Sequence, residues 1–383
     1  MGLLLATVAL VAALLQPQGA ASSRRPAAAE RQPQTLYSSP SGTIAAFAQD
    51  GPLLAWFAPS VKHCNRIQIF SLVTGAAGTL PDETPAALNV TCQWEVVPPV
   101  RLALAGTSVL WTLRDKLSPL PFDYVLGAGV ASRTATRERR FLEVAHTSHG
   151  AGLWLGGIAG DSSPEGTSLV YAVTAVTYVD ELACLSQGTC AMKINARGGG
   201  VYWVVGRKQP ILVPGTTAAV AVAVAGTSVA YIPTASVGRN GAPEASAALP
   251  VQIRSVDSGT VLASVAPQGT PLALALAPDV LALLERTKRR MRLAWYDTTT
   301  GALRGSVQVP SSTSHELTAN DRLIVFHVGR SIRAADVATH RVKTLTRASA
   351  TPVGLSLEGT RLAWAENVGG RGRIRALTLS STG

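Results

Sequence analysis

The sequence predicts an all-β protein. Apolar residues make up 47% of its 383 positions and charged residues 15%, and the chain holds 35 glycines and 23 prolines. A chain this apolar is expected to fold, and its many turn formers favour short strands over helices. Strand-type pairs such as Val-Tyr, Leu-Trp and Ile-Phe recur, whereas no long apolar stripe has helical spacing.

A short phrase recurs along the chain: a run of small apolar residues, a turn, and a second apolar stretch that ends near an aromatic residue. The clearest copies span residues 102–111, 166–171, 221–231 and 355–364. Each copy predicts two strands joined by a tight turn. Seven copies can be placed, with turns near Gly51, Gly106, Gly166, Gly226, Asp279, Asp321 and Gly359. A four-stranded propeller blade takes about 40–50 residues, so the spacing indicates repeated blades, the early ones with insertions.

The rest of each unit, and the two ends of the chain, complete this pattern. Third strands ending in a turn are expected at 67–75, 251–259 and 293–301, with short fourth strands at 261–265, 303–307 and 342–346. The last unit stops after its third strand, and a lone strand precedes the first unit. We therefore expect a single β-propeller at residues 34–383, of seven four-stranded blades, or six or eight. Residues 34–39 would supply the outer strand of the last blade.

The N-terminus indicates export. Residues 3–15 form a run of 13 mostly apolar residues, followed by small and polar residues, so residues 1–21 are interpreted as a signal peptide cleaved near Ala20 or Ala21. Residues 22–33 indicate a flexible lead-in. No later stretch reaches about 18 apolar residues, so no transmembrane span is expected. The mature protein is expected to be secreted, or extracytoplasmic, and monomeric.

The cysteines are consistent with that compartment. An even number of cysteines in an exported chain favours disulfides, and we expect Cys64 to pair with Cys92 and Cys184 with Cys190. The chain has no Cys-x-x-Cys pair, and its cysteine spacing fits no zinc pattern. No metal ligand is assigned.

Two segments carry a family resemblance. Ser-Pro-Ser-Gly-Thr-Ile-Ala-Ala-Phe at 39–47 and Gly-Thr-Arg-Leu-Ala-Trp at 359–364 resemble degenerate repeats of TolB-like and WD-repeat-like β-propellers. The resemblance covers roughly residues 35 to 380, without the Gly-His and Trp-Asp marks of true WD repeats. It implies a propeller and a binding role, and it names no ligand.

Basic residues mark a candidate binding face. The formal net charge is +11, from 28 Arg and 6 Lys against 23 acids. If the strands of each blade are lettered a to d from the channel outward, the b–c and d–a connections share one face, here called the upper face, and the a–b and c–d turns share the lower face. The irregular segments 177–200 and 234–249 belong to the upper face, where binding usually resides. So do ten basic residues, the predicted basic rim: Lys62, Arg66, Arg114, Lys116, Lys288, Arg289, Arg290, Arg330, Arg371 and Arg373. They indicate attraction to an anionic partner. The other interpretation is solvated hairpin tips in a chain whose composition follows a GC-rich genome.

Catalytic patterns are sparse. His146 and His149 form the one close histidine pair, there is no Gly-x-Ser-x-Gly elbow, and the expected innermost strands are rich in alanine, with His315 and Glu316 as the main polar exception. We assign no catalytic residue and no cofactor. The leading hypothesis is a secreted, non-enzymatic propeller that binds an exported protein or an anionic envelope polymer through its upper face, with no nucleic acid expected. The alternative is a propeller-type hydrolase or lactonase with polar groups at the channel ends of its innermost strands.

Overall fold

The structure is a computed structural model that describes most of the propeller region and little before it. The described residues are 32–40, 42–59, 65–72, 77–79, 101–115, 122–129, 139–145, 152–164, 166–180, 183, 186, 191–204, 209–238, 242–288 and 290–380. Within them, no helix is long and apolar enough to cross a membrane. The proposed signal peptide, most of the lead-in and all four cysteines lie outside the described residues.

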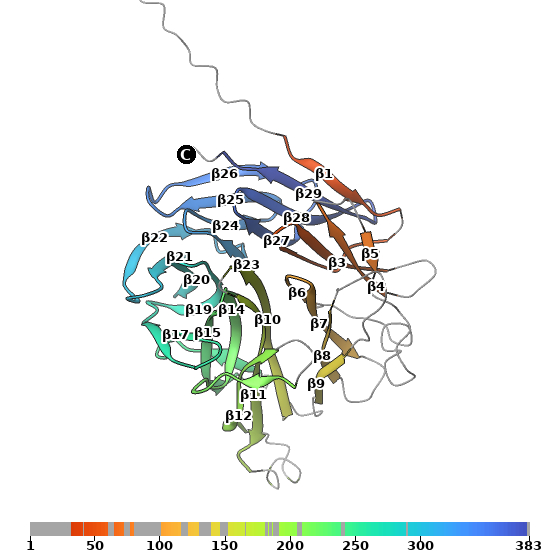
Figure 1. Cartoon of the computed structure of the whole chain (residues 1–383). Coiled ribbons are helices and arrows are strands. Elements are labelled where there is room, and N and C mark those ends of the chain that lie inside the picture. The colour runs from red at the N-terminus through yellow and green to blue at the C-terminus, as the bar shows by residue number, and fades with distance from the viewer. Residues whose placement is uncertain are drawn as a thin grey trace, which may run out of the picture. The chain divides into compact units, whose positions relative to one another are not determined.

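The described strands form seven antiparallel sheets that follow one another around a centre, as Figure 1 shows. In the N-terminal half, in order from strand a outward, these are β2 (Ala46–Asp50), β3 (Leu53–Pro59), β4 (Asn65–Ser71) and β5 (Ala77–Thr79); β6 (Leu102–Ala105), β7 (Ser108–Asp115), β8 (Phe122–Gly129) and β9 (Arg139–Ala145); and β10 (Gly152–Ser163), β11 (Gly166–Tyr178), β12 (Met192–Val204) and β13 (Ile211–Leu212). The predicted all-β propeller is confirmed.

The C-terminal half repeats the arrangement. Its sheets are β14 (Ala219–Ala225), β15 (Ser228–Val237), β17 (Val251–Ser255) and β18 (Val261–Val265), with β16 (Pro243–Ala245) added to β15; β19 (Thr270–Leu276), β20 (Val280–Thr287), β21 (Arg290–Asp297) and β22 (Leu303–Val309); β23 (Thr313–Ala319), β24 (Leu323–Val328), β25 (Ser331–Asp336) and β26 (Val342–Arg347); and β27 (Pro352–Glu358), β28 (Arg361–Val368), β29 (Arg371–Thr378) and β1 (Gln34–Ser38).

The last sheet is completed by the N-terminal strand. β1 pairs antiparallel with β29, from Gln34 opposite Ala376 to Ser38 opposite Arg373. The backbone N–H of Ser39 continues the ladder with a 2.7 Å hydrogen bond to the carbonyl of Gly372. The predicted closure by residues 34–39 is therefore confirmed.

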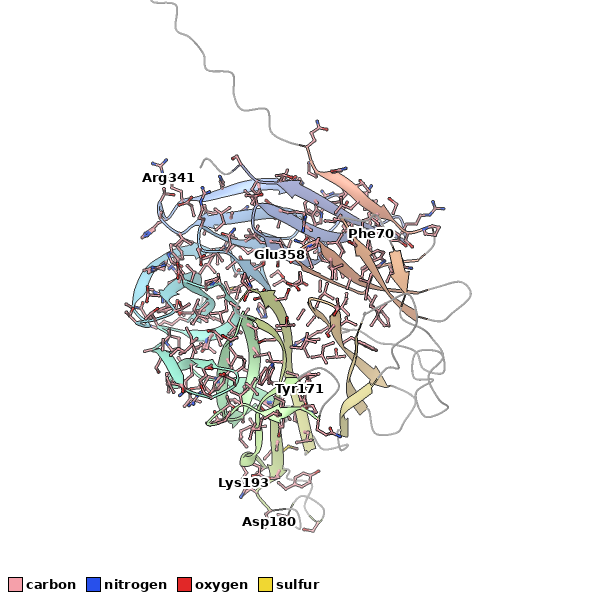
Figure 2. The ribbon with its side chains drawn as sticks, viewed as in Figure 1. Phe70, Tyr171, Asp180, Lys193, Arg341 and Glu358 are labelled. Carbon is pink, nitrogen blue, oxygen red and sulfur yellow. The ribbon has the colours of Figure 1, made fainter. Side chains whose placement is uncertain are left out.

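The core lies between the sheets. The described residues contain seven clusters of buried apolar side chains, and each cluster combines residues of two neighbouring sheets. One of them, which includes Phe47 and Ile374, joins the β27–β1 sheet to the β2–β5 sheet. Figure 2 shows these side chains filling the layers between ribbons. Large rings sit on strands b and c, such as Trp56, Trp364 and Trp295, all 1% exposed or less. Strand a carries small residues, as in Ala219–Ala225, because the sheets converge toward the channel and leave less room there.

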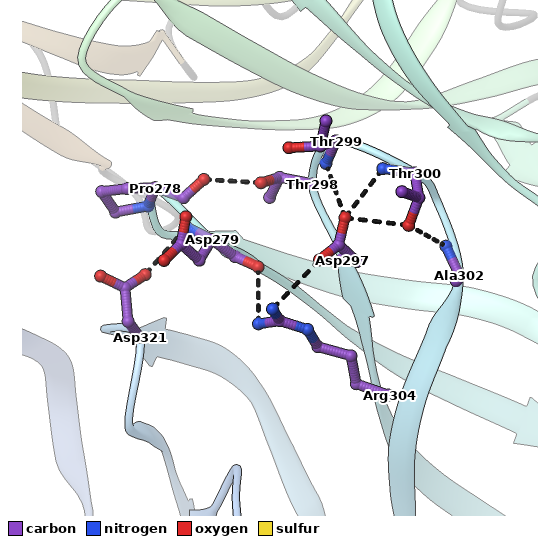
Figure 3. A network of polar contacts seen from close by, with 9 residues as sticks. All are labelled: Pro278, Asp279, Asp297, Thr298, Thr299, Thr300, Ala302, Arg304 and Asp321. Atoms are coloured by element: carbon purple, nitrogen blue, oxygen red, sulfur yellow. Dashed lines mark hydrogen bonds and ion pairs between the residues drawn. The ribbon is translucent and has the colours of Figure 1, made fainter.

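Aspartate closes the c–d turns on the lower face (Figure 3). Asp297 accepts hydrogen bonds from the backbone N–H groups of Thr299 (3.1 Å) and Thr300 (2.8 Å) and from the Thr300 hydroxyl (2.9 Å). The backbone hydrogen bond from Thr300 holds the pKa of Asp297 below its ordinary value. Gly301 follows with φ 71°, and in the next sheet His340 takes the same left-handed conformation with φ 58°. These turns fix where strand d begins.

Alanine at Gly301 tests the close packing of this turn. Its Cβ would lie 2.5 Å from the Ser264 carbonyl oxygen, whereas a Cβ at Gly329, also left-handed at φ +55°, would meet nothing within 4 Å. Gly329→Ala should lower the free energy of unfolding by about 1–2 kcal/mol through backbone strain alone, and Gly301→Ala by about 2–5 kcal/mol through strain plus overlap. Chemical denaturation of both variants measures the difference. Equal losses would mean that the overlap relaxes without cost.

Candidate functional site

Half of the predicted basic rim can be placed. Lys62, Lys116 and Arg289 lie outside the described residues, and for Arg66 and Arg114 only the backbone is described. The close pair His146 and His149 is also outside them. The side chains of Lys288, Arg290, Arg330, Arg371 and Arg373 remain.

Four of these five belong to equivalent b–c turns of three successive sheets. Lys288 and Arg290 lie at the β20–β21 turn, Arg330 at the β24–β25 turn, and Arg371 begins β29; all four are exposed. The b–c turns of successive blades lie on the same face, so these four residues lie on the upper face. Arg330 also donates a 3.3 Å hydrogen bond to the carbonyl of Ser349 in the following d–a connection.

Arg373 has a different role, because it neutralises a buried acid. Its guanidinium lies 3.0 Å from the carboxylate of Glu366, whose side chain is 0% exposed. Glu366 in turn accepts hydrogen bonds from the backbone N–H groups of Ser349 (2.7 Å) and Ala350 (3.4 Å). Arg375 adds a second positive charge 3.7 Å away. We therefore assign Arg373 to anchoring the d–a connection.

A second buried acid repeats this arrangement in the β19–β22 sheet. Glu285, 0% exposed, forms a 2.7 Å ion pair with Arg292 and accepts a 2.7 Å hydrogen bond from the Tyr296 hydroxyl. Burial, together with that hydrogen bond to Glu285, raises the pKa of Tyr296. Arg292 also donates to the side-chain oxygen of Gln268, in the connection that enters β19. Both acids of these strands are thus already paired inside the protein.

A pocket adjoins the rim. It has a volume of about 330 Å³ and is lined by Arg290, Met291, Gln308, Val309 and Ser311. Arg290 and Met291 begin β21, Gln308 and Val309 end β22, and Ser311 follows β22, so the pocket lies at the upper face with Arg290 in its wall. The rim therefore borders a concave surface.

A separate polar cluster, which we call the channel acids, lies at the lower end of the channel. It consists of Asp50, Asp161 and Glu358, and one carboxylate oxygen of each lies within 4.8 Å of the others. Asp50 accepts hydrogen bonds from the N–H of Gly106 and from the N–H (3.1 Å) and hydroxyl of Ser162.

The other two channel acids also hold neighbouring a–b turns. Asp161 accepts from the N–H of Gly226, and Glu358 from the N–H of Gly51. Burial raises the pKa of Glu358 to about 7, and the charges of Asp50 and Asp161 contribute to the increase. Burial also lowers the pKa of Arg361, opposed by the charge of Glu358.

This cluster was not predicted from the sequence. We expected an alanine-lined channel with polar groups, if any, at the starts of the innermost strands, whereas these acids lie at or near the strand ends. A signal was present for two of them, since Asp50 and Glu358 directly precede the turn glycines Gly51 and Gly359. Asp161 had no such mark. His315 and Glu316 lie on β23, where Glu316 approaches the buried His327 at 3.5 Å.

Similarity to known proteins is found among solved structures. No protein-family model matches the sequence, and a search of curated proteins finds no match either. Solved structures similar to this chain include BamB from Moraxella catarrhalis, 10% identical over 89% of this chain and 84% of that chain, with a TM-score of 0.43. The β-propeller domain of the Trilobed protease from Pyrococcus furiosus is 10% identical over 88% and 95%, with a TM-score of 0.49. TolB from Acinetobacter baumannii is 14% identical over 70% and 55%, with a TM-score of 0.35. All three TM-scores are below 0.5, so the propeller assignment rests on the seven sheets themselves. The resemblance to TolB-like and WD-repeat-like propellers is one of fold, and no ligand or partner is transferred from it.

Removing one partner of the buried Glu285–Arg292 pair should strongly lower the free energy of unfolding. Arg292→Met leaves the Glu285 carboxylate buried without its cation, and we expect a loss of about 3–5 kcal/mol in unfolding free energy. The double variant Glu285→Gln/Arg292→Met should recover most of that loss, because no uncompensated charge remains. Urea denaturation of both variants measures the coupling. A double variant as unstable as Arg292→Met would show that the arginine acts through packing instead.

The raised pKa of Glu358 predicts that this residue lowers the stability of the folded protein at high pH. Because its pKa is about 7 when folded and 4.5 ordinarily, the folded state binds more protons between these values, and stability falls as the pH rises through that window. The difference corresponds to at most about 3 kcal/mol, fully expressed above pH 7. Glu358→Gln keeps an acceptor for Gly51 and should raise the melting temperature at pH 8 in the presence of EDTA. The gain should disappear near pH 4.5, and a gain independent of pH would contradict this assignment.

Proposed function

We propose that this protein is an extracytoplasmic, non-enzymatic propeller that binds a negatively charged partner through its upper face. The observation that carries the proposal is the set of four exposed basic side chains, Lys288, Arg290, Arg330 and Arg371, on b–c turns of three successive sheets. The apolar N-terminal run supports export, which would place the partner among exported proteins or anionic envelope polymers.

The charge of the rim is not cancelled by the acids nearest to it. Glu285 and Glu366 are buried and paired with Arg292 and Arg373, so they do not offset the exposed bases. Two further exposed arginines lie toward the same face: Arg286 near the end of β20 and Arg347 at the end of β26. In the upper parts of these three sheets, as far as the structure describes them, the exposed acid is Glu316, 44% exposed and beside His327. An excess of positive charge on one face attracts anionic surfaces and speeds their association.

The pocket beside Arg290 gives this face a shape as well as a charge. An acidic side chain or a polymer's anionic group that enters it would meet three polar residues, Arg290, Gln308 and Ser311. The alternative of a channel hydrolase draws less support, because the channel acids already accept hydrogen bonds from Gly106, Gly226 and Gly51 and hold those turns in place.

Charge reversal on the rim tests the proposal. Lys288→Glu/Arg290→Glu/Arg330→Glu should bind an anionic matrix at least tenfold more weakly than the native protein at low salt, and native binding should fall steeply as salt rises. The matched control is Arg322→Glu/Arg341→Glu/Lys343→Glu, which makes the same change in net charge with exposed residues on or beside lower-face turns. An equal loss in both variants would mean that net charge, and not the rim, drives binding.

Pull-down from the envelope fraction then separates the two kinds of partner. A protein retained by the native chain and lost by the rim variant would identify a protein-binding module. Anionic polymer retained in its place, and resistant to protease treatment, would identify a polymer-binding module. Equal recovery with the native chain and the rim variant would contradict a binding role for this face.

A further inference from the structure

The channel acids are brought together from sheets far apart in the sequence. Asp50 ends β2, Asp161 lies near the end of β10, and Glu358 ends β27. Figure 2 shows Glu358 at the centre of the ring of sheets. Their meeting point is at the lower end of the channel, separate from the upper-face rim and independent of the function proposed for that rim.

Negative charge exceeds positive charge at this point. Arg361, which begins β28, interacts with the charge of Glu358, and its guanidinium donates to the carbonyl of Gly51. The neutral donors at the site are the N–H groups of Gly51, Gly106, Ser162 and Gly226 and the Ser162 hydroxyl.

A buried side-chain amide without a hydrogen-bond partner lies one residue before Asp50, on β2. Gln49 is 6% exposed, and neither its side-chain oxygen nor its nitrogen has a hydrogen-bond partner. Side chains alternate along a strand, so Gln49 shares a face of β2 with Phe47, which packs against Ala363 and Ala365 of the last sheet. Gln49 therefore points into the layer between β2 and β27.

Glu358 enters that layer from the other side. Its neighbour Leu357 packs against the β23–β26 sheet, so Glu358 faces β2, where it accepts the N–H of Gly51. A buried amide left without partners costs about 1–3 kcal/mol, and such a group usually has an unseen partner. A cation between the carboxylates would give the Gln49 oxygen that partner.

We propose that Asp50, Asp161 and Glu358, together with the side-chain oxygen of Gln49, bind one Ca²⁺ ion at the lower end of the channel. The donor set consists of oxygens alone, which suits a hard cation. Ca²⁺ binds oxygen at about 2.3–2.6 Å, so oxygens within 4.8 Å of one another can all contact one such ion. Mg²⁺ needs shorter distances and near-ideal octahedral geometry, which ligands fixed on three separate sheets are less able to supply.

Bound Ca²⁺ would cross-link three sheets of the propeller. Asp50 and Glu358 belong to the sheets that meet at the seam between the start and the end of the chain, and Asp161 belongs to the sheet beyond β6–β9. An ion held by all three would join the seam to the opposite side of the channel.

The test is thermal unfolding of the full chain, stripped of metal with EDTA and dialysed, against increasing CaCl₂ or MgCl₂ at pH 7.5. We expect a saturable rise in melting temperature with Ca²⁺ and a smaller one with Mg²⁺. Isothermal titration should give one Ca²⁺ per chain. Glu358→Gln, which keeps the acceptor for Gly51, should weaken Ca²⁺ binding at least tenfold.

The matched control is Asp321→Asn, which also converts a carboxylate at an a–b turn to an amide. Asp321 accepts the N–H of Asp279 at 2.9 Å and lies outside the channel acids, so this variant should bind Ca²⁺ as the native chain does. The proposal is overturned if the native chain shows neither a thermal shift nor heat at 10 mM Ca²⁺. Equal weakening in both variants, or several equivalent ions per chain, would also overturn it by showing diffuse surface binding.

Discussion

Pairing of β1 with β29 is the constraint on which the rest of the structure depends. Without it the last sheet would have three strands and β29 would expose an unpaired edge, and neighbouring sheets could separate at the seam. Side chains reinforce the same seam: Asn367 accepts the N–H of Ile44 at 2.8 Å and donates to its carbonyl at 2.9 Å, which clamps the segment before β2 to β28. Arg375 donates to the carbonyl of Pro33 at 2.7 Å. Every inter-sheet layer is then bounded on both sides, as the seven shared apolar clusters require.

Buried carboxylates fix the connections at both ends of the sheets by the same chemistry. On the upper face Glu366 accepts backbone N–H groups of the preceding d–a connection, and on the lower face Asp50 and Asp161 accept N–H groups of neighbouring a–b turns. A carboxylate that accepts backbone N–H groups satisfies donors that a loop leaves unpaired. The two ends differ in how the negative charge of the carboxylates is balanced. Each buried acid of the upper face has an arginine partner, whereas the three channel acids share one arginine. Among the residues that the structure describes, three carboxylates therefore gather around one arginine at the lower end of the channel.

The sequence was sufficient for features that depend on local chemistry. Glycine and aspartate turns, alternating apolar strands and the missing fourth strand of the last unit predicted the sheets and the closure by residues 34–39. It was insufficient where function depends on register. Arg373 looked like an exposed rim residue, but it stands opposite Glu366 in the β28–β29 ladder and is held there. Asp50 and Ser162 are hydrogen-bonded across 112 positions of sequence, and no local pattern foretells such a contact.

Separation of charge between the two faces follows from turn geometry. The c–d turns need a short acceptor that binds the backbone N–H groups two and three residues later, which selects aspartate, as at Asp297 and Asp336. Some of that charge is balanced in place, since Arg304 lies 3.1 Å from Asp297. The b–c turns of the last three sheets have no such requirement: Gly329 precedes Arg330, Gly370 precedes Arg371, and at the β20–β21 turn Lys288 itself takes φ 51°. A charged partner at short range therefore meets the local charge of one face more than the net charge of the chain, because screening in salt limits interactions to about 8–10 Å.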